Sequence, residues 1–568
     1  MRLPARRLVC YGLGVGNSFA LMFGLPGQGM HLRLDALSVL FLCILVPQIL
    51  ASALAERRGS IAFWVFAGAM VLTLLAGDAF TLIFGFELMS AASWLLVLRG
   101  DARPATLYAG MAMFSAACLI PAVFLPAGSL AFMLVLLGAG AKAGLAPLHS
   151  WLPRAHPAPP AGVSALMSGG MVKVSLYILI RYAFIEFGAA AQPWWGSVLI
   201  AAGAASVLIG ALRAMLEVEL KTMLACSTVE HAGLIAVGLG IALRAKAMGN
   251  LDLASLALQG ALLCAVAHGL FKPMLFLGAG AVKKATGTTS LDWLGGLMRG
   301  MPRLGMLMLA GAAGMAALPL GPGFAPEFLL LHAVIKAAAT GGILARIGFT
   351  ALLAGLGLSA ALALGAVVRL IGIGFLGRPR SLHAAAAGDA NRATLAGMGL
   401  LAALCVPVAL LPGVVLGMME PVIQLLAPNS APAPLSYAPL SLFLLLAAAA
   451  AAAFFGLRRF AVRGTREVPA WTCGFGSPPA WLPFGDPLTQ PSATGFAEPV
   501  RRAIARGVLA PQGVDPAEAY LLFPLSQVSL RLTRVAEYIR RSTMRQRLAF
   551  VFAALVMFLL ALGLSEGG

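Results

Sequence analysis

Ionisable residues lie inside segments of this chain that are otherwise apolar enough to cross a membrane. A charge at the middle of a spanning helix costs about 2.5–3.5 kcal/mol on insertion scales. A low-dielectric surrounding disfavours the charged form of Lys and Glu, and an approaching opposite charge favours it again, so such groups can exchange protons. Several of them, of both signs and on successive segments, predict a polar path for protons through the bilayer. The six that carry this prediction are Glu87, Lys142, Lys173, His268, Lys272 and Glu327.

Two pairs among the six have charges or a spacing that suggest that the two members act together in proton transfer. Glu87 and Lys142 are opposite in charge. Separating the pair would favour release of a proton from the lysine, and re-forming the pair would favour its uptake. A static ion pair that orders the helices is an equally good interpretation. His268 and Lys272 are four residues apart and therefore share one helix face. Because histidine titrates near neutral pH, a relay along this face is the better interpretation there.

Three further residues are weaker candidates for the same path. Glu230 and His231 are neighbours in sequence and point to different faces of a helix, so one of them could meet the path. Structural hydrogen bonding explains them equally well. Lys336 could be a group near the exit of the path, or a lysine whose ammonium simply reaches the membrane surface.

Other kinds of site are not predicted. The seven cysteines include no C-x-x-C pair, which argues against an iron–sulfur cluster, a zinc site or a disulfide framework. The stretch GAGAKAG at 138–144 lacks the G-K-[ST] ending of a phosphate-binding loop and follows no strand. We therefore expect no catalytic residue, no cofactor-binding residue and no metal ligand in this chain.

The elements that must position these residues are membrane-spanning helices. Of the 568 residues, 60% are hydrophobic and only 11% are charged, against about 25% charged in soluble domains. Apolar stretches of spanning length recur from end to end and predict about fourteen transmembrane helices in an all-α polytopic protein of the cell inner membrane. The net charge of +19 lies mostly at span ends and in short loops. That placement fixes orientation and does not indicate binding to nucleic acid.

Two proline-rich breaks interrupt the predicted spans. One lies at 144–162 and contains five prolines, and the other lies at 317–328 and contains three. Proline removes a backbone donor and ends a helix, and non-helical backbone is tolerated at membrane depth only inside protein or beside a wet cavity. Two interrupted helices at corresponding places predict inverted repeats around an ion site.

These signals divide the chain into six parts. A first span is expected at 8–25, and a basic, amphipathic stretch is expected before the last span. The parts are N-terminal spans at 1–60, a first repeat at 61–215 with its broken helix near 142–160, a second repeat at 216–380 with its broken helix near 317–328, C-terminal spans at 381–456, a cytoplasmic or interfacial basic segment at 457–546, and a last span at 547–568.

Several sequence blocks resemble one known family. The longest reads GAKAGLAPLHSWLPRAHPAPPAGVSALMSGGMVKVSLYILIRY, and FELMS, LKTMLACSTVEHAGLI and HGLFKPMLFLGAGAV match further blocks. Over roughly 70–470 the chain resembles the proton-conducting antiporter-like membrane subunits, which include the L, M and N type subunits of respiratory complex I and Mrp-type antiporter subunits. The S-T-V-E-H block and a late W-T-C-G-F-G segment are most similar to the hydrogenase-type branch, that of hydrogenase-4 component B and formate hydrogenlyase subunit 3.

The resemblance implies a role for each of the six residues. Glu87 matches the acidic partner of the lysine in the broken helix, here Lys142, and Lys173 matches the central lysine of the next helix. His268 and Lys272 match relay positions. The resemblance also implies that Glu327 is the terminal group of the path.

Two departures from the family pattern stand outside the expected path. Arg154 stands where the family usually has an acidic residue in W-L-P-[DE]-A-H, so this loop is expected to face a different partner. The N-terminus looks short by about one span.

The expected function is proton translocation by a membrane subunit of a redox-driven complex, either hydrogenase-4/formate hydrogenlyase-type or NADH:quinone oxidoreductase-like. The redox centre would belong to other membrane or peripheral subunits, with the lipid bilayer as surroundings and Na⁺ as the alternative ion. One alternative is an Mrp-type cation/proton antiporter subunit. Others are a membrane partner of a soluble accessory protein, docked through Arg154 and the basic tail, or a passive scaffold whose charges are structural.

Overall fold

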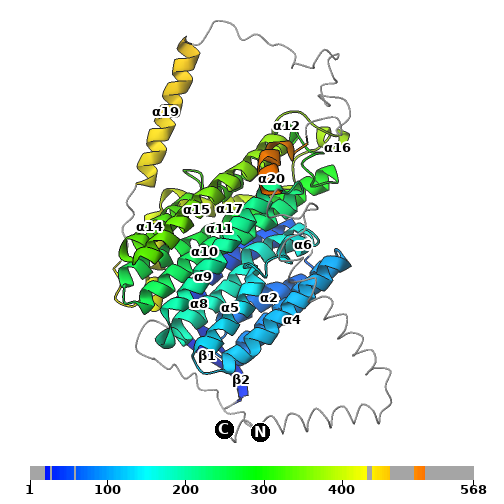
Figure 1. Ribbon diagram of the computed structural model, residues 1–568. Helices are drawn as coiled ribbons and strands as arrows, with labels where there is room; N and C mark the ends of the chain where they lie inside the picture. The colour runs from blue at the N-terminus through cyan, green and yellow to red at the C-terminus, as the bar shows by residue number, and fades with distance from the viewer. Residues whose placement is uncertain (1–18, 26–27, 57–58, 432–437, 461–491, 506–568) are drawn as a thin grey trace, which may run out of the picture. The chain divides into compact units, whose positions relative to one another are not determined.

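The computed structural model describes residues 19–25, 28–56, 59–431, 438–460 and 492–505 (Figure 1). Strands β1 (Phe19–Leu25) and β2 (Gln28–Leu34) pair antiparallel, and every other regular element in this part of the chain is a helix. The first span expected at 8–25 is therefore wrong for residues 19–25; residues 1–18 lie outside the described part. The physical reason is the partner strand, where Met30, Leu32 and Leu34 alternate with other residues in the period-two pattern of a strand.

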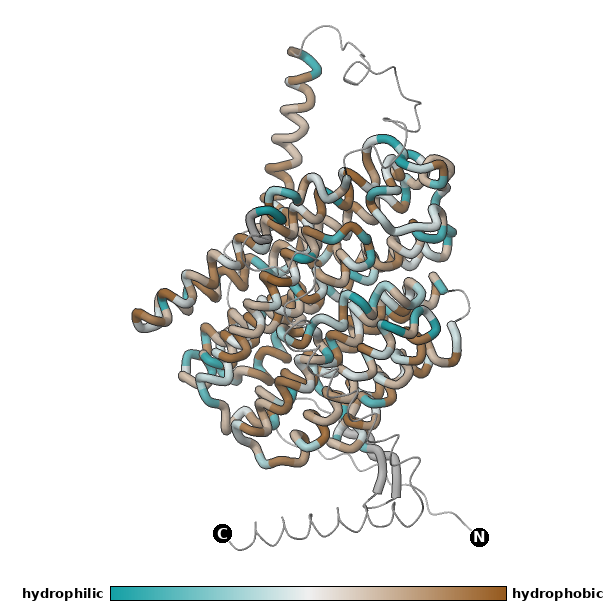
Figure 2. The backbone as a smooth tube through the Cα atoms, turned by 45° about the vertical axis from the view of Figure 1, so that its right-hand side comes forward, coloured by the Kyte–Doolittle hydropathy of each residue, from teal (hydrophilic) through white to brown (hydrophobic). Residues whose placement is uncertain are grey.

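Ten helical segments among the described residues are long and apolar enough to cross a membrane, and three shorter helices are also apolar. Apolar residues dominate these helices, and polar ones gather at the connections (Figure 2). The ten are α1 (Ala36–Ala55), α3 (Ala79–Leu98), α4 (Ala102–Phe124), the run Ala161–Glu186, α9 (Pro193–Leu216), α10 (Leu220–Ala247), α11 (Leu251–Thr286), the run Ile343–Phe375, α17 (Arg392–Leu410) and α19 (Pro439–Phe460). The three are α2 (Ile61–Leu75), α5 (Ser129–Ala143) and α18 (Pro412–Leu426).

The remaining helices are short or belong to interrupted runs. The run Ala161–Glu186 consists of α7 (Ala161–Leu166), the π-helix η1 (Met167–Met171), α8 (Val172–Ile180) and η2 (Arg181–Glu186). The run Ile343–Phe375 consists of α15 (Ile343–Arg369) and η4 (Leu370–Phe375). The others are α6 (Leu152–Ala155), η3 (Gly188–Ala190), α12 (Leu297–Gly300), α13 (Pro302–Met315), α14 (Phe324–Thr340), α16 (Leu382–Ala385), η6 (Gly495–Ala497) and α20 (Glu498–Ala505).

This inventory confirms an all-α polytopic membrane protein. The number fourteen stays a prediction, because the expected last span at 547–568 and most of the basic segment at 457–546 lie outside the described residues. The described residues up to Pro499 form one compact unit. The division into two inverted repeats, at 61–215 and 216–380, also stays a prediction.

The first predicted break is present after α5. This helix has 15 residues and is therefore about 22 Å long, short of a hydrocarbon core of about 30 Å. It ends at Gly144, whose φ of 74° is left-handed and favours glycine. The backbone of the break is satisfied within the protein: Trp151 Nε1 donates to the carbonyl of Ala141 at 2.8 Å, and the amide of Ala146 donates to Ser206 Oγ at 2.8 Å.

The second predicted break lies between α13 and α14. Ala317 and Leu320 both have left-handed backbones, with φ of 46° and 77°. The amide of Leu318 donates to the carbonyl of Ala313 at 3.0 Å, which closes the end of α13. At 14 residues, α13 also stops inside the membrane depth.

Three segments form the centre of the bundle. The run Ala161–Glu186 and α10 are buried along their whole apolar windows, and α11 is 94% buried, whereas the other spans are 56% buried or less. On α9, Gly203 faces Gly233 of α10 so closely that a Cβ at Gly203 would stand 2.8 Å from the Gly233 carbonyl oxygen. This contact holds α9 tightly against the central α10.

Hydrogen bonds attach the described residues 492–499 to one end of the bundle. Arg369 Nε donates to the carbonyl of Ala493 at 2.9 Å, and its second amino group donates to the carbonyl of Glu217 at 2.9 Å. Asp292 accepts from Ser492 Oγ at 3.2 Å. The described residues 492–499 therefore sit at the end of the bundle that carries α12 and α16 (Figure 1).

A buried ion pair joins the start of α1 to the end of the central run. Arg181 donates to Asp35 at 2.8 Å, and their side chains are 3% and 10% exposed. Asp35 also caps α1 by accepting from the amide of Ser38 at 2.9 Å. Burial opposes ionisation, but the Arg181 charge and these hydrogen bonds outweigh it and lower the pKa of Asp35.

We expect Asp35→Asn to lower the free energy of unfolding by about 3 kcal/mol or more, because Arg181 would remain as a buried charge without its counter-ion. Asparagine still caps a helix, so the loss reports the ion pair and not the cap. Unfolding in mixed micelles with increasing SDS measures it. The matched control is Asp252→Asn, at the exposed first turn of α11, which should cost no more than about 1 kcal/mol.

The same variant has a pH signature. Because the folded pKa of Asp35 lies below the ordinary value of 3.8, its stabilisation is present above that value and is lost as the pH falls through the folded pKa. The unfolding curves of the wild type and of the Asp35→Asn variant should therefore converge only at acidic pH. A difference that is already absent at neutral pH would contradict this account of the ion pair.

Candidate functional site

Three of the predicted ionisable residues lie near the middle of their helices, whereas Lys142 and Glu327 lie where a helix is broken. Glu87 is the ninth of 20 residues in α3, and His268 is the eighteenth of 36 in α11. Lys173 is the thirteenth of 26 residues in the run Ala161–Glu186. Because all three helices cross the bundle, these side chains stand at about the same depth. We call the set the mid-membrane row: Glu87, Lys142, Lys173, Glu230, His231, His268, Lys272 and Glu327.

Lys142 is fully enclosed and rests on hydroxyl groups. It is 1% exposed, and its Nζ donates to Ser90 Oγ at 2.9 Å and to the Tyr108 hydroxyl at 2.7 Å. The ammonium also stands 4.4 Å from the centre of the Tyr108 ring, within cation–π range. Ser93 holds the same hydroxyl at 2.6 Å.

Glu87 belongs to this neighbourhood without touching the lysine. It interacts electrostatically with Lys142, yet the ion pairs within 4.0 Å among the described residues do not include the two. Its Oε1 is buried without a hydrogen-bond partner in the described part of the chain. Ser90, one turn further along α3, accepts from Lys142 Nζ and donates to the carbonyl of Phe86. The pair predicted from charge alone is therefore not in contact.

Lys173 follows an interruption in its helix. The π-helix η1 ends two residues before it, and its Nζ donates to the carbonyl of Ser168 at 3.0 Å and contacts His268 Nδ1. Ser168 Oγ shares a hydrogen bond of 2.7 Å with Thr228 Oγ1 of α10. A π-helix departs from the regular α-helical hydrogen-bond pattern, and the carbonyl of Ser168 in η1 here accepts from the lysine.

The row continues through two histidines to Lys272. The rings of His231 and His268 have centroids 5.0 Å apart, and His231 Nδ1 is 2.8 Å from the carbonyl of Ser227. Lys272 contacts Ser227 Oγ and donates to the carbonyl of Leu224 at 3.2 Å. The predicted shared face of His268 and Lys272 therefore meets α10.

Two carboxylates end the row. Glu230 is 2% exposed, and its Oε2 has no hydrogen-bond partner among the described residues. It interacts electrostatically with both Glu327 and Lys272. Glu327 is partly buried in the first turn of α14, directly after the second break. Lys336 lies nine residues further along α14 and is exposed, so the structure does not bring it to the row.

The row has one apolar interruption. Between the Lys142 neighbourhood and Lys173 stands Met171, whose sulfur accepts from the Tyr108 hydroxyl at 3.3 Å. A thioether accepts hydrogen bonds weakly and carries no proton. The geometry thus divides the row into a group around Lys142 and a longer group from Lys173 to Glu327.

Sequence reasoning missed the hydroxyl residues of the row. Ser90, Tyr108, Ser168, Ser227 and Thr228 contact its charged members or one another. Their signal in the sequence is a hydroxyl inside an apolar span, which a search for charges passes over. Among the described residues, no group of three or more His, Cys, Asp and Glu could hold a metal ion.

Chemically, the arrangement can hold protons and pass them on. It supplies amines, imidazoles, carboxylates and hydroxyls, of which Lys142 with its hydroxyls and Lys173 with His268 are in direct contact. Such intramembrane ionisable groups commonly mark ion pathways and proton relays.

The fold is that of a polytopic membrane protein with ionisable side chains buried among its spans, and comparison with known proteins gives the family. Residues 124–354 match the family described as NADH:quinone oxidoreductase/Mrp antiporter, TM, and the chain belongs to it. It is 31% identical to hydrogenase-4 component B of Escherichia coli (strain K12), over 94% of this chain and 89% of that protein. It is 33% identical to formate hydrogenlyase subunit 3 of the same strain, over 67% of this chain and 61% of that protein.

A solved structure supports the same fold. The chain resembles one chain of the membrane-bound sulfane sulfur reductase, an archaeal respiratory membrane complex, with a TM-score of 0.74. The match covers 96% of this chain and 92% of the other at 21% identity. The resemblance predicted from the sequence blocks, including its hydrogenase-type branch, is confirmed.

We expect Gly169→Ala to destabilise the site, because a Cβ there would overlap the amide oxygen of Gln48 and the rigid ring of Pro273. Overpacking of this kind costs about 1–3 kcal/mol, and it would displace η1 and hence Lys173. Unfolding with SDS measures the loss. Gly399→Ala on α17, where a Cβ meets nothing within 4 Å, is the matched control and should be neutral or slightly stabilising. Equal stability of the two variants would contradict the close packing at η1.

Proposed function

We propose that this chain translocates protons across the inner membrane as a subunit of a redox-driven complex of the hydrogenase type. The observation that carries the proposal is the mid-membrane row, in which ionisable side chains from neighbouring helices follow one another at one depth. A passive scaffold would need no such succession of titratable groups, each of which is costly in hydrocarbon. Membership of a family of multisubunit membrane proteins supports it.

Each member of the row has a proposed role. Lys173 is the central carrier, since it begins the longer group, at the end that faces Met171 and Lys142, and contacts His268. Lys142 passes a proton to Lys173 past Met171. Glu87 favours the charged form of Lys142 through its own negative charge. A water molecule beside Met171 would complete that transfer.

The other half of the row is a relay towards an exit. His231 and His268 pass the proton to Lys272, and Glu230 with Glu327 receives it at the second break. The two carboxylates interact electrostatically. Because like charges repel, ionisation of one carboxylate disfavours ionisation of the other, and one of the two is available to accept a proton.

The redox chemistry is proposed to lie in partner subunits. The names of the relatives, hydrogenase-4 and formate hydrogenlyase, describe redox complexes. The row offers amines and hydroxyls more than the dense oxygen cages that alkali and alkaline-earth cations prefer, which favours H⁺ over Na⁺.

The orientation follows from the charge of the connections. The connections 76–78, 125–128, 187–192, 248–250 and 341–342, at one end of the bundle, contain no Lys or Arg themselves, and the basic residues that flank them are Arg33, Arg244, Lys246, Lys336 and Arg346. The opposite end carries Arg99, Arg154, Lys283, Lys284, Arg299, Arg378 and Arg380. The positive-inside rule places that basic end in the cytoplasm, together with the described residues 492–499.

We expect Lys173→Met to lower redox-driven proton pumping about 10²-fold, because the thioether fills the space of the lysine but carries no proton. The purified complex, reconstituted in liposomes and supplied with its electron donor, reports pumping through a pH-sensitive dye.

Lys336→Met is the matched control, since Lys336 is exposed on α14, and it should pump like the wild type. Assembly of each variant is checked by co-purification of the partner subunits. Undiminished pumping by an assembled Lys173→Met complex would contradict the proposal. Pumping that follows a Na⁺ gradient without electron transfer would instead favour the antiporter alternative.

A further inference from the structure

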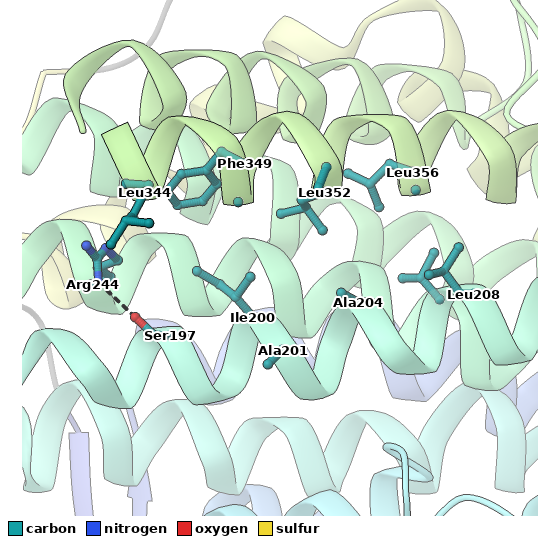
Figure 3. A pocket seen from close by; sticks show the side chains of 15 residues that line it. Ser197, Ile200, Ala201, Ala204, Leu208, Arg244, Leu344, Phe349, Leu352 and Leu356 are labelled. Carbon is teal, nitrogen blue, oxygen red and sulfur yellow. Dashed lines mark hydrogen bonds between the residues drawn. The ribbon is translucent and has the colours of Figure 1, made fainter. Parts of the chain in front are cut away.

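An apolar groove runs along the outside of the bundle between α9 and α15 (Figure 3). Its cavity volume is about 560 Å³. Of the fifteen residues that line it, only Ser197 and Arg244 are polar. Both stand at one end of the groove, beside Leu344, and Arg244 donates to Ser197 Oγ at 2.8 Å.

We propose that this groove is a binding site for one phospholipid, with an acyl chain along α9 and α15 and the phosphate on Arg244. The site is separate from the mid-membrane row and does not depend on the proposed function. A phospholipid combines one anionic group with a long apolar chain, and the groove combines one cationic end with a long apolar wall. This complementarity selects a lipid over a soluble anion, which could not fill the apolar part.

The dimensions fit one leaflet of a bilayer. Along α9 the lining runs from Ser197 to Leu208, or about 16 Å of helix. Half of a hydrocarbon core of about 30 Å is about 15 Å. Arg244 lies three residues before the end of α10, so its guanidinium stands where the hydrocarbon gives way to the headgroups. The lipid would belong to the leaflet opposite the basic end of the bundle.

The guanidinium is held ready for a phosphate. Arginine carries five N–H donors in a planar fork that matches phosphate oxygens. The hydrogen bond to Ser197 uses one donor and fixes the fork at the mouth of the groove. The wall opposite is open: a Cβ at Gly348 of α15 would meet nothing within 4 Å, so an acyl chain finds room beside it.

A photoactivatable lipid tests the proposal. The complex, purified through a tag on this chain, is reconstituted in vesicles of phosphatidylethanolamine and phosphatidylglycerol that contain a trace of phosphatidylglycerol with a diazirine on its acyl chain. After irradiation, peptide mass spectrometry locates the adducts. We expect them within 197–208 of α9 and 344–356 of α15.

Two pairs of variants make the result specific. Gly348→Leu fills the groove and should lower the adduct yield at least about tenfold, whereas Gly357→Leu, outside the lining and also with open space around its Cβ, should leave it unchanged. Arg244→Gln should lower the yield about tenfold through the lost charge-assisted hydrogen bonds. Arg346→Gln, on an exposed arginine that does not line the groove, should not.

Either of two results would overturn the proposal. The first is a yield that does not distinguish each variant from its control. The second is the absence of lipid adducts from both stretches while a photo-cross-linking amino acid in place of Leu352 forms a bond to a helix of a partner subunit. That result would mean that protein and not lipid covers this groove.

Discussion

Hydrocarbon offers no partner to a polar group, and this constraint shapes the chain from its backbone to its candidate site. Where α5 stops inside the membrane, Trp151 and Ser206 of the same chain satisfy the freed backbone. Where a lysine enters the interior, hydroxyls of neighbouring helices surround it, as Ser90 and Tyr108 surround Lys142. The two broken helices and the row are thus parts of one solution, in which protein groups replace the water that the bilayer excludes.

Much of the fold follows from the lengths of the apolar stretches in the sequence and from the residues that interrupt them. Spanning length, proline and glycine are strong signals because hydrocarbon allows few alternatives, and both breaks were predictable from them. The hairpin at Phe19–Leu34 was not, because the apolar residues of β1 are also compatible with a helix, and only the partner strand decides between the two.

The candidate site was predictable in its charged residues and not in their contacts. A charge in an apolar span is conspicuous, whereas the distance between Glu87 and Lys142 depends on side-chain conformations that no spacing reveals. Lys142 donates to Ser90, and a serine in a helix carries no signal that it will accept from a buried lysine. Arg181 escaped notice for a related reason, since its partner Asp35 lies 146 residues away and outside the span.

The common depth of the row has an electrical consequence. A transmembrane potential acts on a charge only when that charge changes depth, and the full crossing is worth about 2.3 kcal/mol per elementary charge per 100 mV. Under the proposed function, steps from Lys142 through Lys173 to Lys272 would run parallel to the membrane plane, so the potential would neither drive nor oppose them. The voltage would act only on the steps that bring a charge to this depth and carry it away. Local electrostatics would then govern the lateral steps, and the potential would act at the two broken helices.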